Sequence, residues 1–226
     1  MLFRSETAAR LTHWAAENAK TTRSLLKRVD AITPLAQPLQ SLQIAELPRP
    51  PKGGKGASDD GVAWLALLDP ALAGHDLGLI SEAGLPAVAD PGARLVALAH
   101  EAGIEVVPLS GPSSLLLALA ASGLNGQSFA FVGYLPVDAA ARTARIRELE
   151  ALSVRQQQTQ LLIETPYRNE ALRQALLSAL KPGTRLSISV GLTLPGGWTQ
   201  TATVADWRSN RTTLPDRIPA VFAILA

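Results

Sequence analysis

Length, composition and charge exclude several kinds of protein. Of the 226 residues, 47% are hydrophobic and 18% are charged, so the chain can bury a core and is not a disordered tail. The formal net charge of +2 permits contact with RNA without requiring it, and the absence of cysteine excludes disulfides, thiolate metal ligands and cysteine nucleophiles.

The sequence gives no sign of a membrane segment. No apolar run approaches the roughly 20 residues that a membrane span requires. The opening residues MLFRSETAAR also lack the apolar core of a signal peptide. We therefore expect a cytoplasmic protein without membrane contact, long enough for two modest domains.

The N-terminal residues predict helix followed by one strand. Residues 5–29 are expected to form a helix in two parts, with an apolar face from Leu11, Trp14 and Ala15. A strand is possible at 42–47.

A loop and a further helix follow. The segment 48–56 mixes proline, glycine and cations, which predicts a surface loop. Lys52 and Lys55 in this loop would either serve solubility or contact phosphate. Residues 58–60 then cap a helix that we expect to end near Pro70.

The stretch 76–103 predicts a strand, a loop of small residues and a helix. Residues 76–80 are a short apolar run. The helix 93–102 is expected to have Asp90 as its N-cap, Pro91 in its first position and Gly103 just beyond its end. Ligands of open α/β sheets bind at the carboxyl ends of strands, so this loop is expected to face a ligand.

The same order of elements recurs through the rest of the chain. A strand at 104–108 precedes a second small-residue loop and the apolar helix 115–121. Further strands are expected at 129–132, 161–164, 186–190, 198–204 and 219–225, and further helices at 139–152 and 169–180. This alternation predicts an α/β protein of two domains, 1–110 and 111–226, with a mostly parallel first sheet and a mixed second sheet.

Five motifs occur in order along the chain: SEAGLPAVADPG, VVPLSGPSSLLLALAASGL, FVGYLP, IETPYR and IPAVFAI. In order and spacing they resemble the motifs of the tetrapyrrole methylase superfamily of S-adenosylmethionine-dependent methyltransferases. Within it, the chain looks closest to the branch that methylates a ribose 2′-hydroxyl of small-subunit ribosomal RNA. The resemblance runs from about Arg10 to the end of the sequence.

The resemblance implies two α/β domains with S-adenosylmethionine in the cleft between them, and a homodimer. It also implies which residues contact this cofactor: Ala83, Gly84, Leu85, Val88, Ser113, Ser114, Glu164, Gly191 and Leu192. Such residues suit a bulky zwitterion, because Gly and Ala allow close approach of the backbone and hydroxyl or N–H groups can bind its carboxylate.

The chain departs from the family pattern at three places. No segment before Arg10 resembles the family's opening strand, so either the chain has lost that strand or the sequence lacks part of the protein. The acidic pair and basic residue of the rRNA branch correspond to the stretch 17–23, which has Asn18 in place of Asp. The lysines usual after the Phe-Leu-Pro motif are absent from 137–140.

Glu17 and Arg23 are the catalytic candidates. If the methyl acceptor is a hydroxyl, Glu17 would remove its proton and Arg23 would face the substrate; a solvated helix end is the alternative for both residues. The three histidines, His13, His75 and His100, lack metal-ligand spacing, and we expect no metal.

Three functions remain open from the sequence. The first is methylation of ribosomal RNA, which predicts a basic rim and salt-sensitive binding. The second is methylation of a tetrapyrrole or another small molecule, which the modest charge and the absent lysines favour slightly. The third is a non-catalytic protein built on a decayed methylase fold.

Overall fold

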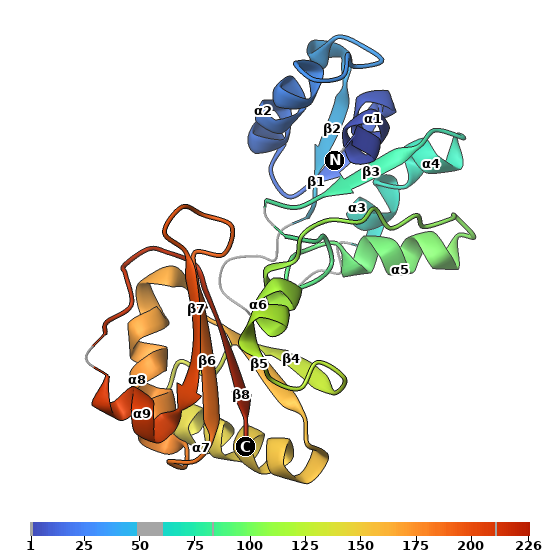
Figure 1. Ribbon diagram of the computed structural model, residues 1–226. Coiled ribbons are helices and arrows are strands. Elements are labelled where there is room, and N and C mark those ends of the chain that lie inside the picture. Colours follow the sequence, from blue (N-terminus) through green and yellow to red (C-terminus); the bar gives the residue numbers. More distant parts are fainter. Residues whose placement is uncertain (1, 49–60, 83, 211) are drawn as a thin grey trace. The chain divides into compact units, whose positions relative to one another are not determined.

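The computed structural model describes residues 2–48, 61–82, 84–210 and 212–226. The chain divides into two compact units, Met1–Pro112 and Ser113–Ala226, which are described separately below (Figure 1). In the described part of the chain, no helix has both the length and the apolar character needed to cross a membrane.

The first unit is built on a three-stranded parallel sheet with the strand order β2-β1-β3. The strands are β1 (His13–Ala16), β2 (Gln43–Glu46) and β3 (Leu77–Ile80). The helices of this unit are α1 (Leu2–Arg10), α2 (Ala19–Asp30), the 3₁₀ helix η1 (Leu39–Ser41), α3 (Gly61–Ala66), α4 (Asp69–Leu72) and α5 (Ala93–Glu101).

Apolar side chains cover both faces of this sheet. Ala15 of β1 belongs to a buried cluster against which Leu77 and Leu79 of β3 pack. The neighbouring residue Trp14 belongs to a separate cluster that also receives Ile80. Because successive side chains on a strand point to opposite faces, the two clusters lie on the two sides of the sheet.

The strand β1 corrects the expectation of a helix over residues 5–29. The segment is helical on both sides of β1, but His13–Ala16 pairs with two strands. Trp14, Ala15 and Ala16 are all buried. A strand buried on both faces has a continuous apolar run, and a run this short does not distinguish strand from helix.

The expected strand at 104–108 is also wrong, because these residues form no strand. Their burial does alternate as in a strand: Ile104 and Val106 pack on the same cluster as Leu79, while Val107 is 65% exposed. Among the described strands, β3 pairs with β1 alone. An extended segment without a neighbouring strand cannot form a ladder.

Two helix boundaries in this unit differ from expectation. The N-cap of α5 is Gly92, with φ +128°, and neither Asp90 nor Pro91 has the expected position. The helix expected to end near Pro70 instead becomes two short helices, and Pro70 lies in the first turn of the second, α4. The predicted loop lies outside the described residues beyond Pro48, as does the cap at 58–60.

The second unit holds a five-stranded mixed sheet with the order β4-β5-β8-β6-β7. The strands are β4 (Phe129–Gly133), β5 (Thr159–Ile163), β6 (Arg185–Val190), β7 (Trp198–Thr203) and β8 (Ala220–Leu225). β4 and β5 are parallel, and β8 runs antiparallel to both of its neighbours. The α/β class, with one parallel and one mixed sheet, is therefore confirmed.

Helices cover both faces of the second sheet (Figure 1). They are α6 (Ser114–Ser122), α7 (Ala139–Gln156), the 3₁₀ helix η2 (Pro166–Arg168), α8 (Asn169–Ala179) and α9 (Val204–Ser209). One buried cluster joins α7, α8 and α9 to the sheet, and another joins α6 to β5 and β8. The short helix α9, which holds the buried Trp207, was not expected from the sequence.

Candidate functional site

The carboxyl edge of the first sheet brings predicted residues together. Glu17 directly follows β1 and Glu82 lies two residues beyond β3, and the two parallel strands end at the same edge. The backbone N of Glu17 donates to Ile80 O at 3.1 Å, and the backbone N of Glu82 donates to Glu17 Oε2 at 2.9 Å. The carboxylate of Glu17 is therefore held in place beside the loop that follows β3.

The start of α2 is fixed to the same edge. Asn18 is its N-cap, and its side chain accepts hydrogen bonds from the backbone N of Lys20 and Thr21. Thr21 Oγ1 donates to a carboxylate oxygen of Glu82. Asn18 therefore caps the helix as Asp would. Arg23 lies exposed on the same helix.

The loop after β3 has an unusual backbone. Gly84 has φ +73°, and Ala87 and Ala89 both have φ +66°. Left-handed conformations are strained for residues with a Cβ, so this loop is held by its surroundings. Val88, between the two alanines, is 41% exposed, as a side chain available for packing on a ligand should be. Leu85 is half-buried.

Asp90 is a residue of this edge that the sequence did not single out as functional. Burial, followed by the nearby charge of Glu17, raises the pKa of the Asp90 carboxyl, and a hydrogen bond from Ser81 opposes that shift. Asp90 Oδ2 also lies 3.7 Å from the point where a Cβ on Gly84 would be. The only sequence signal was the Asp-Pro-Gly turn, which we interpreted as a helix cap.

In the second unit, Ser113 and Ser114 lie at the start of α6. Ser113 is the N-cap residue, and its side chain makes no capping hydrogen bond. The first buried residue of the helix, Leu115, belongs to the cluster on which Leu192 packs. The first N–H groups of α6 are therefore not capped by a side chain, and such groups bind carboxylates and phosphates well.

Glu164 directly follows β5 and is 7% exposed. One of its carboxylate oxygens, Oε1, accepts from the backbone N of Thr165 at 2.8 Å, and Oε2 pairs with Arg168 Nη2 at 3.2 Å. This carboxylate ties η2 to the end of β5. Its described partners, Thr165 and Arg168, give this carboxylate a structural role at the edge.

Gly191 follows β6 and needs to be glycine. Its φ is +59°, and a Cβ there would lie 3.1 Å from Ile218 Cγ2. Asn169, which is 1% exposed, holds this neighbourhood, because its Nδ2 donates to Ile218 O at 2.9 Å. Sequence reasoning missed Asn169; its place directly after the Thr-Pro-Tyr-Arg stretch was the only signal.

The predicted cofactor residues thus fall into two groups, one in each unit. Ala83 lies outside the described residues. Gly84, Leu85 and Val88 share a loop with the Glu17 and Asp90 edge. In the second unit, Glu164 and Gly191 follow β5 and β6, which both run antiparallel to β8 and so end at the same edge.

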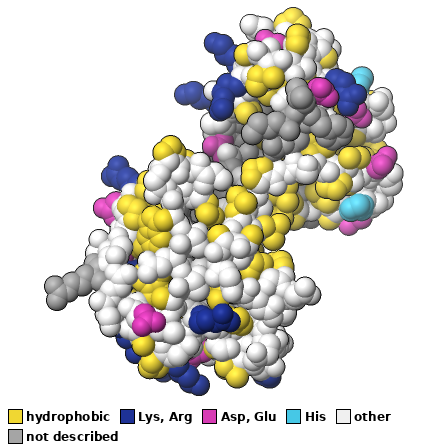
Figure 2. All heavy atoms as spheres, viewed as in Figure 1, with side chains coloured by type: hydrophobic (Ala, Val, Ile, Leu, Met, Phe, Trp, Pro, Cys, Tyr) yellow, Lys and Arg dark blue, Asp and Glu magenta, His cyan; other side chains and the backbone are white. Residues whose placement is uncertain are grey.

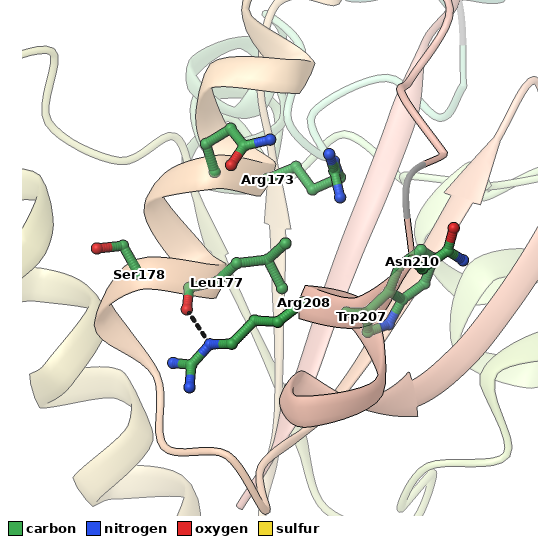
Figure 3. Close-up of a pocket in the computed structure, with 7 residues that line it drawn as sticks. Arg173, Leu177, Ser178, Trp207, Arg208 and Asn210 are labelled. Atoms are coloured by element: carbon green, nitrogen blue, oxygen red, sulfur yellow. Dashed lines mark hydrogen bonds between the residues drawn. The ribbon is translucent and has the colours of Figure 1, made fainter.

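A hollow elsewhere in the second unit does not coincide with these groups. It has a volume of about 280 Å³ and lies between α8 and α9 (Figure 3). Its two cations are engaged in structural contacts: Arg208 Nε donates to Leu177 O at 2.9 Å, and the buried Arg173 is bound to Glu170. Burial alone would raise the pKa of Glu170, but hydrogen bonds from Arg173 and Gln174 hold that pKa below its usual range.

Two α/β units of this kind, with glycine-containing loops at the ends of their strands, match a known class. A family model described as "Tetrapyrrole (Corrin/Porphyrin) Methylases" matches residues 18–208. The match spans well over half of the chain, so the chain belongs to this family.

Several curated relatives have the name "Ribosomal RNA small subunit methyltransferase I". The chain is 40% identical over 114 residues to that of Vibrio cholerae, covering 50% of this chain and 38% of the relative. It is 42% identical over 120 residues to that of Mesorhizobium japonicum, covering 53% and 40%. With that of Halalkalibacterium halodurans it shares 32% identity over 154 residues, covering 68% and 46%. The chain thus spans less than half the length of these relatives.

Solved structures agree on the fold. The crystal structure of uroporphyrin-III C-methyltransferase from Thermus thermophilus has a TM-score of 0.50 and 19% identity, covering 100% of this chain and 87% of that one. The X-ray structure of cobalt-precorrin-4 methyltransferase has a TM-score of 0.53 and 14% identity, covering 100% and 88%. At these identities the likeness establishes the fold alone.

Proposed function

We propose that the protein is an S-adenosylmethionine-dependent methyltransferase that acts on a ribose 2′-hydroxyl of small-subunit ribosomal RNA. The observation that carries the proposal is the identity of 32–42% with relatives named for methylation of that RNA, over as much as 68% of this chain. Membership of a methylase family supports the reaction type.

The residues present fit such a cofactor at the second unit. The first turn of α6 has no side-chain cap, so its N–H groups and the hydroxyls of Ser113 and Ser114 are suited to the carboxylate of an amino acid. Gly191 and the half-buried Leu192 offer close backbone approach and apolar contact to a nucleoside. In the first unit, Gly84, Leu85 and Val88 would contact the same cofactor.

The cofactor supplies an electrophilic methyl group on a sulfonium. The protein therefore has to align the acceptor oxygen with that carbon, exclude water and accept a proton. Glu17 is oriented by the backbone N of Glu82 and is the group that would take the proton from a ribose hydroxyl. Asp90 lies at the same edge, where burial and then the charge of Glu17 raise the pKa of its carboxyl.

The deciding experiment measures transfer of a labelled methyl group. Purified protein and methyl-labelled S-adenosylmethionine are incubated either with 30S subunits from cells or with a small-molecule extract containing tetrapyrroles. We expect label in the RNA of the subunits, and a Glu17→Gln variant should lose most of the turnover but retain cofactor binding in calorimetry. Label only in the extract would replace the proposal by the small-molecule alternative.

That alternative has its own support. The solved structures with the same fold include methyltransferases named for uroporphyrin and cobalt-precorrin substrates. The absence of lysine from 137–140 also removes cations that the rRNA branch would place there. Calorimetry with S-adenosylmethionine that gives no heat of binding would instead indicate a non-catalytic protein.

We also propose that the protein acts as a homodimer, as the family resemblance implies, and that it works in the cytoplasm, as expected from the absence of cysteine. Light scattering on the purified chain tests the first point, and a mass equal to one copy over the whole concentration range would contradict it. Fractionation of cells tests the second, with the protein expected beside the small ribosomal subunit.

A further inference from the structure

The helix α2 has a basic face. Lys20, Arg23 and Lys27 recur at spacings of three and four residues, so they lie in one stripe along the helix. All three are exposed, and the opposite side of α2 is buried through Thr22, Leu26 and Val29. Figure 2 shows Lys and Arg side chains grouped over the region that α2 occupies in Figure 1.

These charges have no acidic partners on their own helix. The first turn of α2 holds no acid, and its one acid, Asp30, accepts a hydrogen bond from the backbone N of Leu35. Over the described ranges, no ion pair involves Lys20, Arg23 or Lys27. Like charges at these spacings destabilise an isolated helix, whereas a helix that only needs solubility usually alternates the two signs.

The stripe has a fixed position next to the proposed site. Asn18 caps α2 immediately after Glu17, and Thr21 is hydrogen-bonded to Glu82 in the loop beyond β3. From Lys20 to Lys27 the helix axis advances about 10 Å, the length over which a nucleic-acid strand presents about three phosphates. The stripe therefore has the charge, the length and the position to hold an RNA strand whose nucleotide reaches Glu17.

We propose that Lys20, Arg23 and Lys27 bind successive phosphates of the substrate RNA. This rests on the proposed function and gives Arg23 a role in binding the substrate backbone, apart from any proton transfer. The partner is an extended polyanionic strand, because three cations spread over about two turns of helix match the spacing of successive phosphates along such a strand.

The test measures RNA binding without any methyl transfer. The probe is a fluorescein-labelled single-stranded RNA of about 20 nucleotides, longer than one protein site. Its anisotropy is titrated with the full chain at several salt concentrations. The test variant combines Lys20→Ala, Arg23→Ala and Lys27→Ala. The matched control combines Arg147→Ala, Arg155→Ala and Lys181→Ala, three exposed cations of the second unit, and so has the same change of net charge.

The α2 variant should bind at least about tenfold more weakly and reduce the slope of log K against log salt by about 2, since each phosphate contact on a single strand contributes about 0.7. The control should change affinity by less than about twofold. Far-UV circular dichroism and the Tm establish that both variants fold. Equal losses in the two variants, or absence of binding by the unmodified chain, would overturn the proposal.

Methyl transfer then separates this inference from the proposed function. If the α2 variant methylates 30S subunits as fast as the unmodified chain, the proposed reaction stands and the proposed binding role of α2 is wrong. RNA binding that depends on α2, without any methyl transfer to subunits, supports the binding surface and contradicts the proposed reaction.

Discussion

Gly78 lies directly beneath the ring of Trp14, its partner in the register of β1 and β3. A Cβ at Gly78 would be 2.6 Å from Trp14 Cε3 and 2.9 Å from Leu11 Cδ1. We expect Gly78→Ala to lower the free energy of unfolding by about 1–3 kcal/mol, because the ring and the strand must move apart. Gly126→Ala is the control, since nothing lies within 4 Å of its added Cβ. Urea unfolding measures both, and equal stability of the two variants would contradict this packing.

Asp90 should make the free energy of unfolding fall as the pH rises, the opposite of the effect of a carboxyl group whose pKa is lowered by folding. Burial, and then the charge of Glu17, raises its pKa, so the folded protein binds this proton more tightly than the unfolded chain. The stabilising contribution is complete below the ordinary Asp pKa and is lost as the pH rises through the raised value. We expect Asp90→Asn to remove this part of the pH dependence.

Urea unfolding of the Asp90→Asn variant at a series of pH values above about pH 4 tests this expectation. Asp76→Asn, at an exposed acid just before β3, is the control. An Asp90→Asn profile parallel to that of the unmodified protein would show that the Asp90 carboxyl titrates as in the unfolded chain.

Among the elements, α2 depends on its cap. The side-chain oxygen of Asn18 accepts hydrogen bonds from two backbone N–H groups at the start of the helix. A side chain without an acceptor at that distance would leave both groups without this partner. We expect Asn18→Ala to cost about 1 kcal/mol in the free energy of unfolding, and Asn18→Asp to cost much less because its carboxylate accepts the same bonds. Thermal unfolding of the pair measures the difference, and equal losses would show that the cap is not what holds α2.

Elements stabilised by local sequence were predictable, and those that depend on distant partners were not. The helix α6 and the strands β5 and β6 lie within a residue or two of their expected positions, because apolar pattern and turn residues specify them. The strand β1 was not predicted because its short apolar run forms a strand by pairing with β2 on one side and β3 on the other. Residues 104–108 have strand-like burial but no ladder, since ladder formation depends on a neighbour.

The same reasoning applies to the candidate site. Gly84 and Gly191, which both have a positive φ, were named because the resemblance to the family implies them, and Gly84 also lies in the small-residue loop that the strand pattern predicts. Asp90 and Asn169 did not, because their importance comes from burial and from partners distant in sequence. Sequence alone could not reveal either environment.

At the scale of the whole molecule, each buried cluster among the described residues draws its members from one unit. We therefore expect the fragment Ser113–Ala226 to fold alone, with cooperative urea unfolding and a buried Trp207. The matched control is the same fragment with Ile146→Asp, which places a charge in a fully buried position and should abolish cooperativity. Gradual unfolding of the unmodified fragment would mean that its core is incomplete without the first unit.

The position of β8 has a consequence for how the second unit is made. It is the last strand of that unit in sequence, yet it lies in the middle of the sheet between β5 and β6. During synthesis the strand pairs β4-β5 and β6-β7 emerge from the ribosome before β8. Until β8 is made, β5 and β6 each have one edge with unpaired backbone groups, and the two pairs are not connected in one sheet. Final assembly must wait for late residues to insert, so nascent chains are expected to need protection by chaperones until that insertion occurs.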